Sequence, residues 1–267
     1  VLCNMRVVVL APTTLLASQL YTSFKNRLSP HGANIDLLSR FRSKKDVISI
    51  KNNILNKKND VLIGTHALLS DEAYLDNLGL LIIDEEHRFG VSQKEKIKHC
   101  KNNVDVLSMS ATPIPRSMNL AISGIYSISL LQTPPLLRLP IKTYIKTFND
   151  TTLVDAITFE VDRGGQVFCV NDDVRSISAL SDRLRRLLPT LVIKVLHGQE
   201  SAKTIENNMK LFLAKKISVL VCTSIIEAGI DVPNANCIII NNAHMFGLAQ
   251  LYQMRGRVGR SNKQAYA

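Results

Sequence analysis

Four adjacent polar residues, Asp84, Glu85, Glu86 and His87, directly follow an apolar run at residues 80–83. Three neighbouring carboxylates repel one another, so their burial at a strand end is costly unless a cation or solvent offsets the charge. Mg²⁺ prefers oxygen ligands, so one carboxylate can bind the ion while the next orients or deprotonates a water that attacks a phosphate. An ordinary acidic helix N-terminus, which the helix dipole favours, would explain the same residues.

A second group of residues lies near the end of the sequence. Gln253, Gly256, Arg257 and Arg260 are spaced i, i+3, i+4 and i+7, which predicts that they share one face of a helix. Gly256 leaves room for close approach, and the planar donors of the two arginines suit phosphate oxygens and the charge that develops in phosphoryl transfer. A solvated basic helix is the alternative, although a helical glycine costs about 1 kcal/mol relative to alanine.

Short hydroxyl side chains follow another apolar run. Ser110 and Thr112 come directly after residues 104–109, and we expect them to link the acidic residues to a neighbouring loop. A turn of Ser and Thr before Pro113 is the alternative, and it is the commoner arrangement for these residues taken alone.

Small polar residues also follow two further strand patterns. Thr65 and Thr223 occupy such positions, where hydroxyls often contact nucleic-acid phosphates. Gly229 and Asp231 lie in the same stretch as Thr223, and Gly229 suggests a backbone position that needs unusual freedom. A purely structural role fits these loops equally well.

Strand-like and helical patterns alternate along the chain and must position these groups. The strand patterns are almost uniformly apolar, as expected for parallel strands covered on both faces. They lie at residues 7–10, 61–63, 80–83, 104–108, 167–170, 192–196, 219–221 and 237–240, with helical patterns at 15–27, 177–188 and 203–214 among them. This order predicts a doubly wound α/β fold, in which ligands bind at the carboxyl ends of the strands.

The chain divides at a proline-rich stretch. Pro134, Pro135 and Pro140 stop helices and indicate a linker, which predicts two domains at residues 1–135 and 136–267. The chain starts with Val1 rather than Met, and a strand pattern begins by residue 7. We therefore expect a fragment of a longer protein, with its first domain truncated at the N-terminus and its second domain truncated after residues 253–260.

The composition narrows the class of protein. With 46% hydrophobic residues among 267, the chain can bury a sizeable core, and no apolar run approaches the roughly 18–20 residues of a membrane helix. The net charge of +11 favours a polyanionic partner such as nucleic acid, while 5% aromatic residues and no Trp disfavour stacking on single-stranded bases. Five cysteines without a C-x-x-C pair disfavour a zinc ribbon or disulfide framework, so we expect buried thiols in a cytoplasmic protein.

The ordered set of motifs resembles the motor of superfamily-two helicases and translocases. The matching segments are motif Ia at 11–17, Ib at 64–66, II at 84–87, III at 110–112, V at 223–231 and VI at 253–260. Within this superfamily the chain is most similar to the bacterial transcription-repair coupling factors, with the RecG branch-migration helicases next. Both groups carry the sequence His-Arg-Phe-Gly-Val, found here at residues 87–91, and Ala-Thr-Pro-Ile-Pro-Arg, found here at 111–116. The coupling factors are favoured by the sequences at 39–43, 164–167 and 246–251 and by Glu86.

The resemblance implies two RecA-like parallel-sheet domains and an ATP-dependent double-stranded DNA translocase that uses Mg²⁺. Members of the coupling-factor family displace stalled RNA polymerase and recruit excision-repair proteins. The resemblance implies that these partners bind through regions outside this chain. By position, Asp84 and Glu85 would serve Mg²⁺ and water activation, with Asp84 as the metal ligand, while Arg257 and Arg260 would reach the nucleotide phosphates. The remaining matched positions are nucleotide-coupling at Glu86, His87, Ser110, Thr112, Gly229, Asp231 and Gln253, and DNA-binding at Thr13, Thr65, Arg116 and Thr223.

The chain also departs from the family pattern. No G-x-x-x-x-G-K-[ST] loop, whose backbone and Lys cradle phosphates, is present, and in the family this loop lies just upstream of the position that matches Val1. We therefore expect no significant ATPase activity from this chain by itself. His244 stands where an acid is usual, and Glu200 where Met is usual. A RecG-like helicase acting on branched DNA and a non-catalytic DNA-binding remnant stay open as alternatives.

Overall fold

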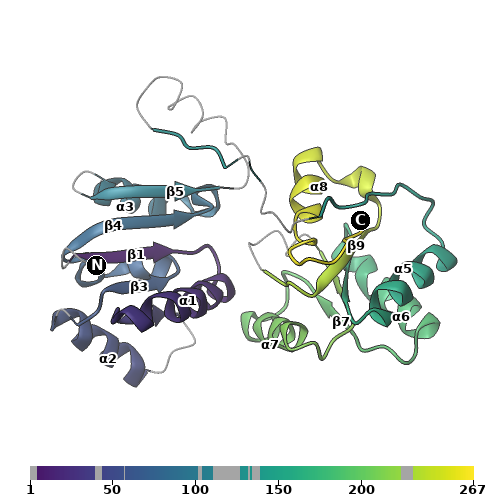
Figure 1. The fold of residues 1–267 in the computed structure, drawn as a ribbon, viewed down its shortest axis with the longest axis horizontal. Coiled ribbons are helices and arrows are strands. Elements are labelled where there is room, and N and C mark those ends of the chain that lie inside the picture. The colour runs from purple at the N-terminus through teal and green to yellow at the C-terminus, as the bar shows by residue number, and fades with distance from the viewer. Residues whose placement is uncertain are drawn as a thin grey trace. The chain divides into compact units, whose positions relative to one another are not determined.

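The computed structural model describes residues 5–39, 44–56, 58–101, 104–110, 127–131, 133, 139–223 and 231–267. The chain forms two compact units, Val1–Ile128 and Ser129–Ala267, called unit 1 and unit 2 here (Figure 1). The predicted domain boundary after residue 135 lies outside the described residues, so it stays a prediction. Within the described ranges, no helix is long and apolar enough to cross a bilayer.

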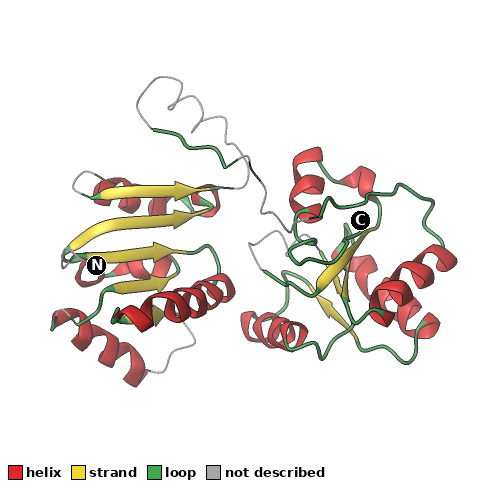
Figure 2. Cartoon of the chain, viewed as in Figure 1, coloured by secondary structure: helices red, strands yellow, loops and turns green. Residues whose placement is uncertain are grey.

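Unit 1 contains a five-stranded parallel sheet in the order β2-β3-β1-β4-β5, with helices packed against it (Figure 2). Its strands are β1 (Arg6–Leu10), β2 (Ile35–Leu38), β3 (Val61–Gly64), β4 (Leu78–Asp84) and β5 (Asp105–Met109). Its helices are α1 (Thr14–Leu28), α2 (Lys44–Leu55) and α3 (Val91–Lys101), with 3-10 turns η1 (Ser29–His31), η2 (His66–Ser70), η3 (Glu72–Leu75) and η4 (Glu86–Arg88).

The central strand of unit 1 is buried on both faces. Val8 and Leu10 pack in a cluster that includes residues of α2 and α3, whereas Val9 packs with residues of α1. Since side chains alternate between the faces of a strand, both sets must be apolar. This explains the uniformly apolar run at residues 7–10, and it confirms the predicted α/β class with parallel strands.

Unit 2 contains a four-stranded parallel sheet in the order β7-β8-β6-β9. Its strands are β6 (Gln166–Val170), β7 (Ile193–Leu196), β8 (Val219–Cys222) and β9 (Ala235–Ile240). Its helices are α5 (Asp150–Asp162), α6 (Val174–Leu187), α7 (Ala202–Leu213) and α8 (Leu248–Arg255), with the 3-10 turn η6 (Ala243–Met245) before α8.

Capping side chains explain where several helices begin. The Asp173 carboxylate accepts a hydrogen bond from the Arg175 amide, so α6 begins at Val174 rather than at the predicted residue 177. Thr13, Asn149 and Ser201 cap α1, α5 and α7 in the same way. Such caps typically contribute about 1 kcal/mol each, which makes the start of a helix a local property of the sequence.

The two units repeat one topology, which the sequence does not show directly. β6, β7, β8 and β9 follow the same spatial order as β1, β2, β3 and β4, and the register shifts at the first residue of each central strand, Arg6 or Gln166. Both of these buried side chains donate hydrogen bonds to backbone carbonyls of neighbouring segments. Tyr266 bridges β9 in parallel, as β5 pairs with β4 in unit 1.

Three cysteines of unit 2, Cys169, Cys222 and Cys237, are free and buried in its sheet. Burial raises the pKa of Cys169 and of Cys237 to about 12, and it raises the pKa of Cys222 as well. This confirms the expectation of buried thiols for these three positions. The thiolate is the nucleophilic form, so these residues are chemically inert in the folded chain.

We predict that Cys169, Cys222 and Cys237 escape alkylation by N-ethylmaleimide at pH 8 in the folded chain. Replacing Cys3 and Cys100 by Ser removes the other two thiols of the sequence. Mass spectrometry should then find no adduct before urea is added and three adducts afterwards. Modification of the folded chain at the rate of the unfolded chain would contradict the burial of these thiols.

Candidate functional site

The carboxyl edge of the sheet in unit 1 holds the acidic residues. β4 ends at Asp84, and Glu85 follows in the left-handed conformation, with φ 50° and ψ 54°. The Glu85 amide donates to the Met109 carbonyl at 2.9 Å, which extends the pairing of β4 with β5 by one step. The chain therefore turns sharply at Glu85, and this residue is only 7% exposed.

A left-handed glutamate is unusual. Residues other than glycine pay on the order of 1–3 kcal/mol in such a conformation, and they persist where the surrounding structure holds them, often at functional sites. The matching position of unit 2, between β9 and η6, is taken by Asn242 at φ 51° and ψ 47°. Asparagine tolerates this conformation better than most residues. Unit 1 thus retains a glutamate at a position where asparagine would adopt the same left-handed conformation with less steric strain.

Two serine hydroxyls hold the acidic side chains. Ser110 donates through Oγ to Glu85 Oε2 at 2.7 Å, and Ser108 donates to Glu86 Oε2 at 2.7 Å. Ser110 therefore contacts the acidic residues, while the predicted link onward to a neighbouring loop stays a prediction and Thr112 lies outside the described residues. Ser108 was not predicted, although its position two residues before Ser110 puts both hydroxyls on the same side of an extended segment.

The acidic residues offer oxygen ligands only. Within the described residues, no group of three or more His, Cys, Asp or Glu side chains is arranged to hold a metal ion by itself. Mg²⁺ usually keeps several waters and binds one or two carboxylates together with substrate phosphates. The donor set of Asp84, Glu85 and Glu86 therefore fits Mg²⁺ that arrives with a phosphate ligand. The His87 side chain is not among those that the structure describes, so its predicted nucleotide-coupling role stays a prediction.

The predicted DNA-contacting threonines all follow the carboxyl ends of strands, but they differ in exposure. Thr13 caps α1, because its Oγ1 accepts from the Leu16 amide at 3.3 Å. Thr65 is 4% exposed, so its burial does not favour a side-chain contact with DNA. Thr223 is half-buried after β8. Arg116 and Gly229 lie outside the described residues.

The arginines of unit 2 lie on a turn rather than on one helical face. Helix α8 ends at Arg255, Gly256 forms its C-cap, and Gly259 adopts φ 72°. The prediction that residues 253 to 260 share a helical face is therefore wrong. Glycine is a weak helix former, and Gly256 caps α8 while its own backbone stays right-handed at φ −67°. The left-handed Gly259 then turns the chain away from the helix direction before Arg260.

The turn separates the environments of the two arginines. Arg257 is 7% exposed, whereas the Arg260 side chain is exposed at 30% and pairs with Asp231, with 3.3 Å between Nη1 and Oδ1. Ion pairs this exposed contribute little to stability, so Arg260 can exchange Asp231 for another anion at small cost. Arg260 and Asp231, which belong to different sequence motifs, thus lie together. Gln253 lies on α8, two residues before the helix ends at Arg255.

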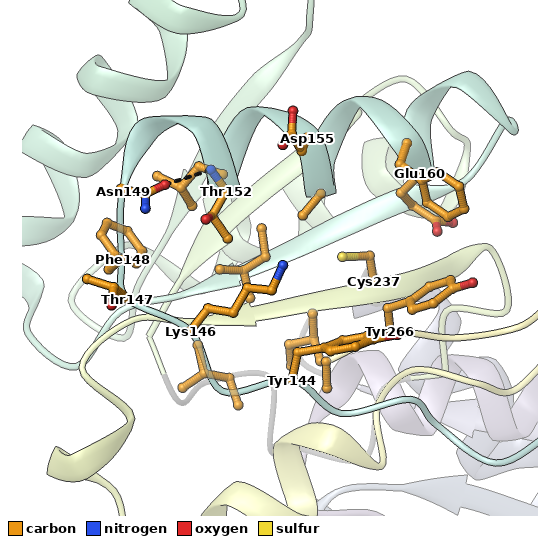
Figure 3. A pocket seen from close by; sticks show the side chains of 17 residues that line it. Tyr144, Lys146, Thr147, Phe148, Asn149, Thr152, Asp155, Glu160, Cys237 and Tyr266 are labelled. Atoms are coloured by element: carbon orange, nitrogen blue, oxygen red, sulfur yellow. Dashed lines mark hydrogen bonds between the residues drawn. The ribbon is translucent and has the colours of Figure 1, made fainter.

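A pocket of about 440 Å³ lies elsewhere in unit 2 (Figure 3). Helix α5, strand β9 and residues 144–149 form its walls, and its described lining contains none of the predicted site residues. Each unit therefore carries its own group of candidate side chains: the acidic residues after β4 in unit 1, and the arginines after α8 in unit 2. The pocket beside α5 is separate from the second group.

We predict that relief of the left-handed strain makes Glu85→Gly more stable than Glu85→Ala by about 0.5–1 kcal/mol, because both remove the carboxylate but only glycine removes the steric cost. Urea unfolding followed by circular dichroism measures the difference. The same pair of substitutions at Glu95, an exposed residue of α3, is the control. There alanine should be the more stable by about 1 kcal/mol. If Glu85→Ala proved at least as stable as Glu85→Gly, the strain at this position would be contradicted.

Two family models match the chain. A DEAD/DEAH box helicase model matches residues 2–120, and a helicase conserved C-terminal domain model matches residues 149–262. These matches correspond to unit 1 and unit 2, respectively, and they agree with two RecA-like parallel-sheet domains.

Relatives extend the likeness along the whole chain. The chain is 49% identical over 267 residues to the transcription-repair-coupling factor of Haemophilus influenzae, and 48% identical over 262 residues to that of Escherichia coli K12. These alignments cover 100% and 98% of this chain but 23% of each relative, so the chain spans about a quarter of their length. A solved structure of RecG bound to a three-way DNA junction is 37% identical, with a TM-score of 0.79, and covers 98% of this chain and 35% of that one.

Proposed function

The chain belongs to the helicases that pair a DEAD/DEAH box domain with a helicase conserved C-terminal domain, and we propose that it is part of the motor of an ATP-dependent double-stranded DNA translocase. One observation carries the proposal. Glu85 is buried, held in a strained backbone conformation and hydrogen-bonded to Ser110, at the edge of a parallel sheet where ligands bind. A carboxylate fixed in this way is suited to orient or deprotonate a water.

The other site residues take roles around this carboxylate. We propose that Asp84 binds Mg²⁺, which when bound neutralises charge on the phosphates of ATP. Ser110 and Ser108 keep the carboxylates of Glu85 and Glu86 in place through the hydrogen bonds of 2.7 Å. Because these serines lie on or next to β5, a shift of that segment moves both carboxylates. This supports the coupling role proposed for Ser110 and Glu86. The same role is proposed for Thr112 and His87 from their positions in the matched motifs alone.

For unit 2 we propose that the guanidinium groups of Arg257 and Arg260 stabilise negative charge on the nucleotide phosphates. Asp231 holds Arg260 until a phosphate replaces it, which the exposed 3.3 Å pair supports. Gln253, Gly229 and Asp231 accompany these arginines as nucleotide-coupling residues. Thr13, Thr65, Arg116 and Thr223 are proposed DNA contacts, with the burial of Thr65 favouring its backbone amide over its side chain.

The whole protein's role rests on the relatives' names. Since the relatives from Haemophilus influenzae and Escherichia coli are transcription-repair-coupling factors, we propose that the longer protein displaces stalled RNA polymerase and couples transcription to nucleotide excision repair. Contacts with polymerase and with repair proteins are assigned to regions outside this chain. The net charge of +11 supports attraction to duplex DNA.

We predict that the 267-residue chain binds duplex DNA but shows no DNA-stimulated ATP hydrolysis, because its sequence contains no glycine-rich phosphate loop with Lys. A longer protein from the same gene that includes such a loop should hydrolyse ATP in the presence of duplex DNA. Phosphate release by both proteins, with and without DNA, measures this. Turnover by the 267-residue chain, or none by the longer protein, would sink the assignment.

The RecG likeness supports a second candidate, a helicase that acts on branched DNA. Its observation is the TM-score of 0.79 to RecG bound to a three-way junction. The longer protein separates the two candidates when it is given a stalled transcription complex and a three-way junction in parallel. Release of polymerase supports the coupling factor, and unwinding of the junction without release supports the RecG-like activity.

A further inference from the structure

Arg163, the C-cap residue of α5, contacts two aromatic rings and a buried carboxylate. Its guanidinium carbon lies 5.3 Å from the ring centre of Phe159 and 5.2 Å from that of Tyr266. The two rings meet edge to face at 5.5 Å. Phe159 comes from the same helix, whereas Tyr266 belongs to the segment that follows the arginine turn. A planar cation beside two rings gains cation–π attraction from each and loses freedom of movement.

Glu160 fixes the same arginine through hydrogen bonds. Its side chain is fully buried, and Oε2 accepts from both Nε, at 2.7 Å, and Nη2 of Arg163. A Cβ on Gly165 would lie 1.6 Å from Glu160 Oε1, so glycine is needed there for the carboxylate to fit. Figure 3 shows Glu160 and Tyr266 at the same end of the pocket beside α5.

A buried ion pair of this kind is a poor source of stability. Burial raises the pKa of Glu160, while the hydrogen bond and charge of Arg163 act in the opposite direction. Desolvation often cancels the attraction in such pairs, so an apolar pair of similar volume would hold the fold as well. What an apolar pair cannot supply is a set of directed hydrogen-bond donors.

Arg163 uses those donors on the segment that follows Arg260. Its Nη2 donates to the Gln264 carbonyl at 2.5 Å, and Lys263 donates through Nζ to the Arg163 carbonyl at 3.0 Å. The same segment closes on the arginine turn, because a Cβ on Gly259 would lie 3.2 Å from the Ala265 Cβ. Arg260 is therefore bracketed by the turn at Gly259 and by the residues that Arg163 holds.

We propose that Arg163, held by Glu160, is a positioning residue for Arg260 and Arg257. The proposal rests on the function given above for these two arginines. Arg163 acts on them through the chain, by fixing the course of residues 261–266. A displacement of about 1 Å in a group that stabilises a reacting phosphate can cost on the order of 100-fold in rate.

The kinetic test uses the longer protein that carries the phosphate loop. Arg163→Leu should lower kcat for DNA-stimulated ATP hydrolysis by about tenfold or more and leave the KM for ATP and the Kd for DNA within about twofold. Arg163→Lys keeps a positive charge beside Glu160 but lacks the fork that also reaches Gln264. It should therefore recover the melting temperature without recovering kcat.

Arg183→Leu is the matched control. Arg183 pairs with Asp150 at 2.6 Å and lies 5.6 Å from the ring centre of Phe148, so its loss also removes an ion pair and a cation–π contact from unit 2. Neither of these contacts involves residues 261–266, and its kcat should match the parent. Parental kcat in Arg163→Leu, or recovery of kcat together with the melting temperature in Arg163→Lys, overturns the proposal.

A second measurement does not depend on ATP hydrolysis. In the 267-residue chain, Arg163→Leu should speed hydrogen exchange at the amides of Arg257 and Tyr266, which donate to Met254 and Asn236, and leave β6 protected. Unchanged exchange at both amides refutes the anchoring whatever the kinetic result. If the longer parent protein hydrolyses no ATP, the function proposed above fails, and the exchange result still decides whether Arg163 anchors the turn.

Discussion

Burial of the central strands on both faces is the constraint on which this structure depends. β1 and β6 have apolar neighbours above and below, so their side chains cannot carry chemistry along most of their length. Polar groups are tolerated where a strand ends and its backbone leaves the sheet. Asp84, Glu85 and Thr223 all occupy such positions. The fold thus leaves the carboxyl ends of the strands for the candidate side chains that follow them.

Both groups of candidate residues are held by features that cost stability. Glu85 has a left-handed backbone conformation, which Asn242 adopts with less strain at the matching position of unit 2. Glu160 is a fully buried carboxylate whose placement requires a glycine at position 165. Features of this kind are expected where the placement of a group matters more than its contribution to folding. At Glu85 the strained backbone fixes where the carboxylate lies, and at Glu160 the buried carboxylate fixes Arg163, which holds the segment at Gln264.

Much of the fold could be predicted because parallel strands leave a strong trace in sequence. The apolar runs at 7–10 and 219–221 predicted buried strands, which the structure contains as β1 and β8. β2, with Asp36 in a short edge strand, left too weak a pattern to be found. The end of α8 was missed because the spacing of arginines suggested a longer helix, whereas the helix ends at Arg255 and the left-handed Gly259 turns the chain. Contacts between distant segments, such as those of Arg163, leave no local pattern at all.

We propose that Glu85 acts on water rather than on nucleotide binding. The most direct test compares ATP binding and single-turnover hydrolysis in the longer protein with Glu85→Gln, using the exposed Glu95→Gln as the control. We expect ATP affinity within about threefold of the parent and hydrolysis slower by on the order of 100-fold, since glutamine keeps the side-chain size but cannot serve as a base. Hydrolysis at the parental rate in Glu85→Gln would contradict this role of Glu85.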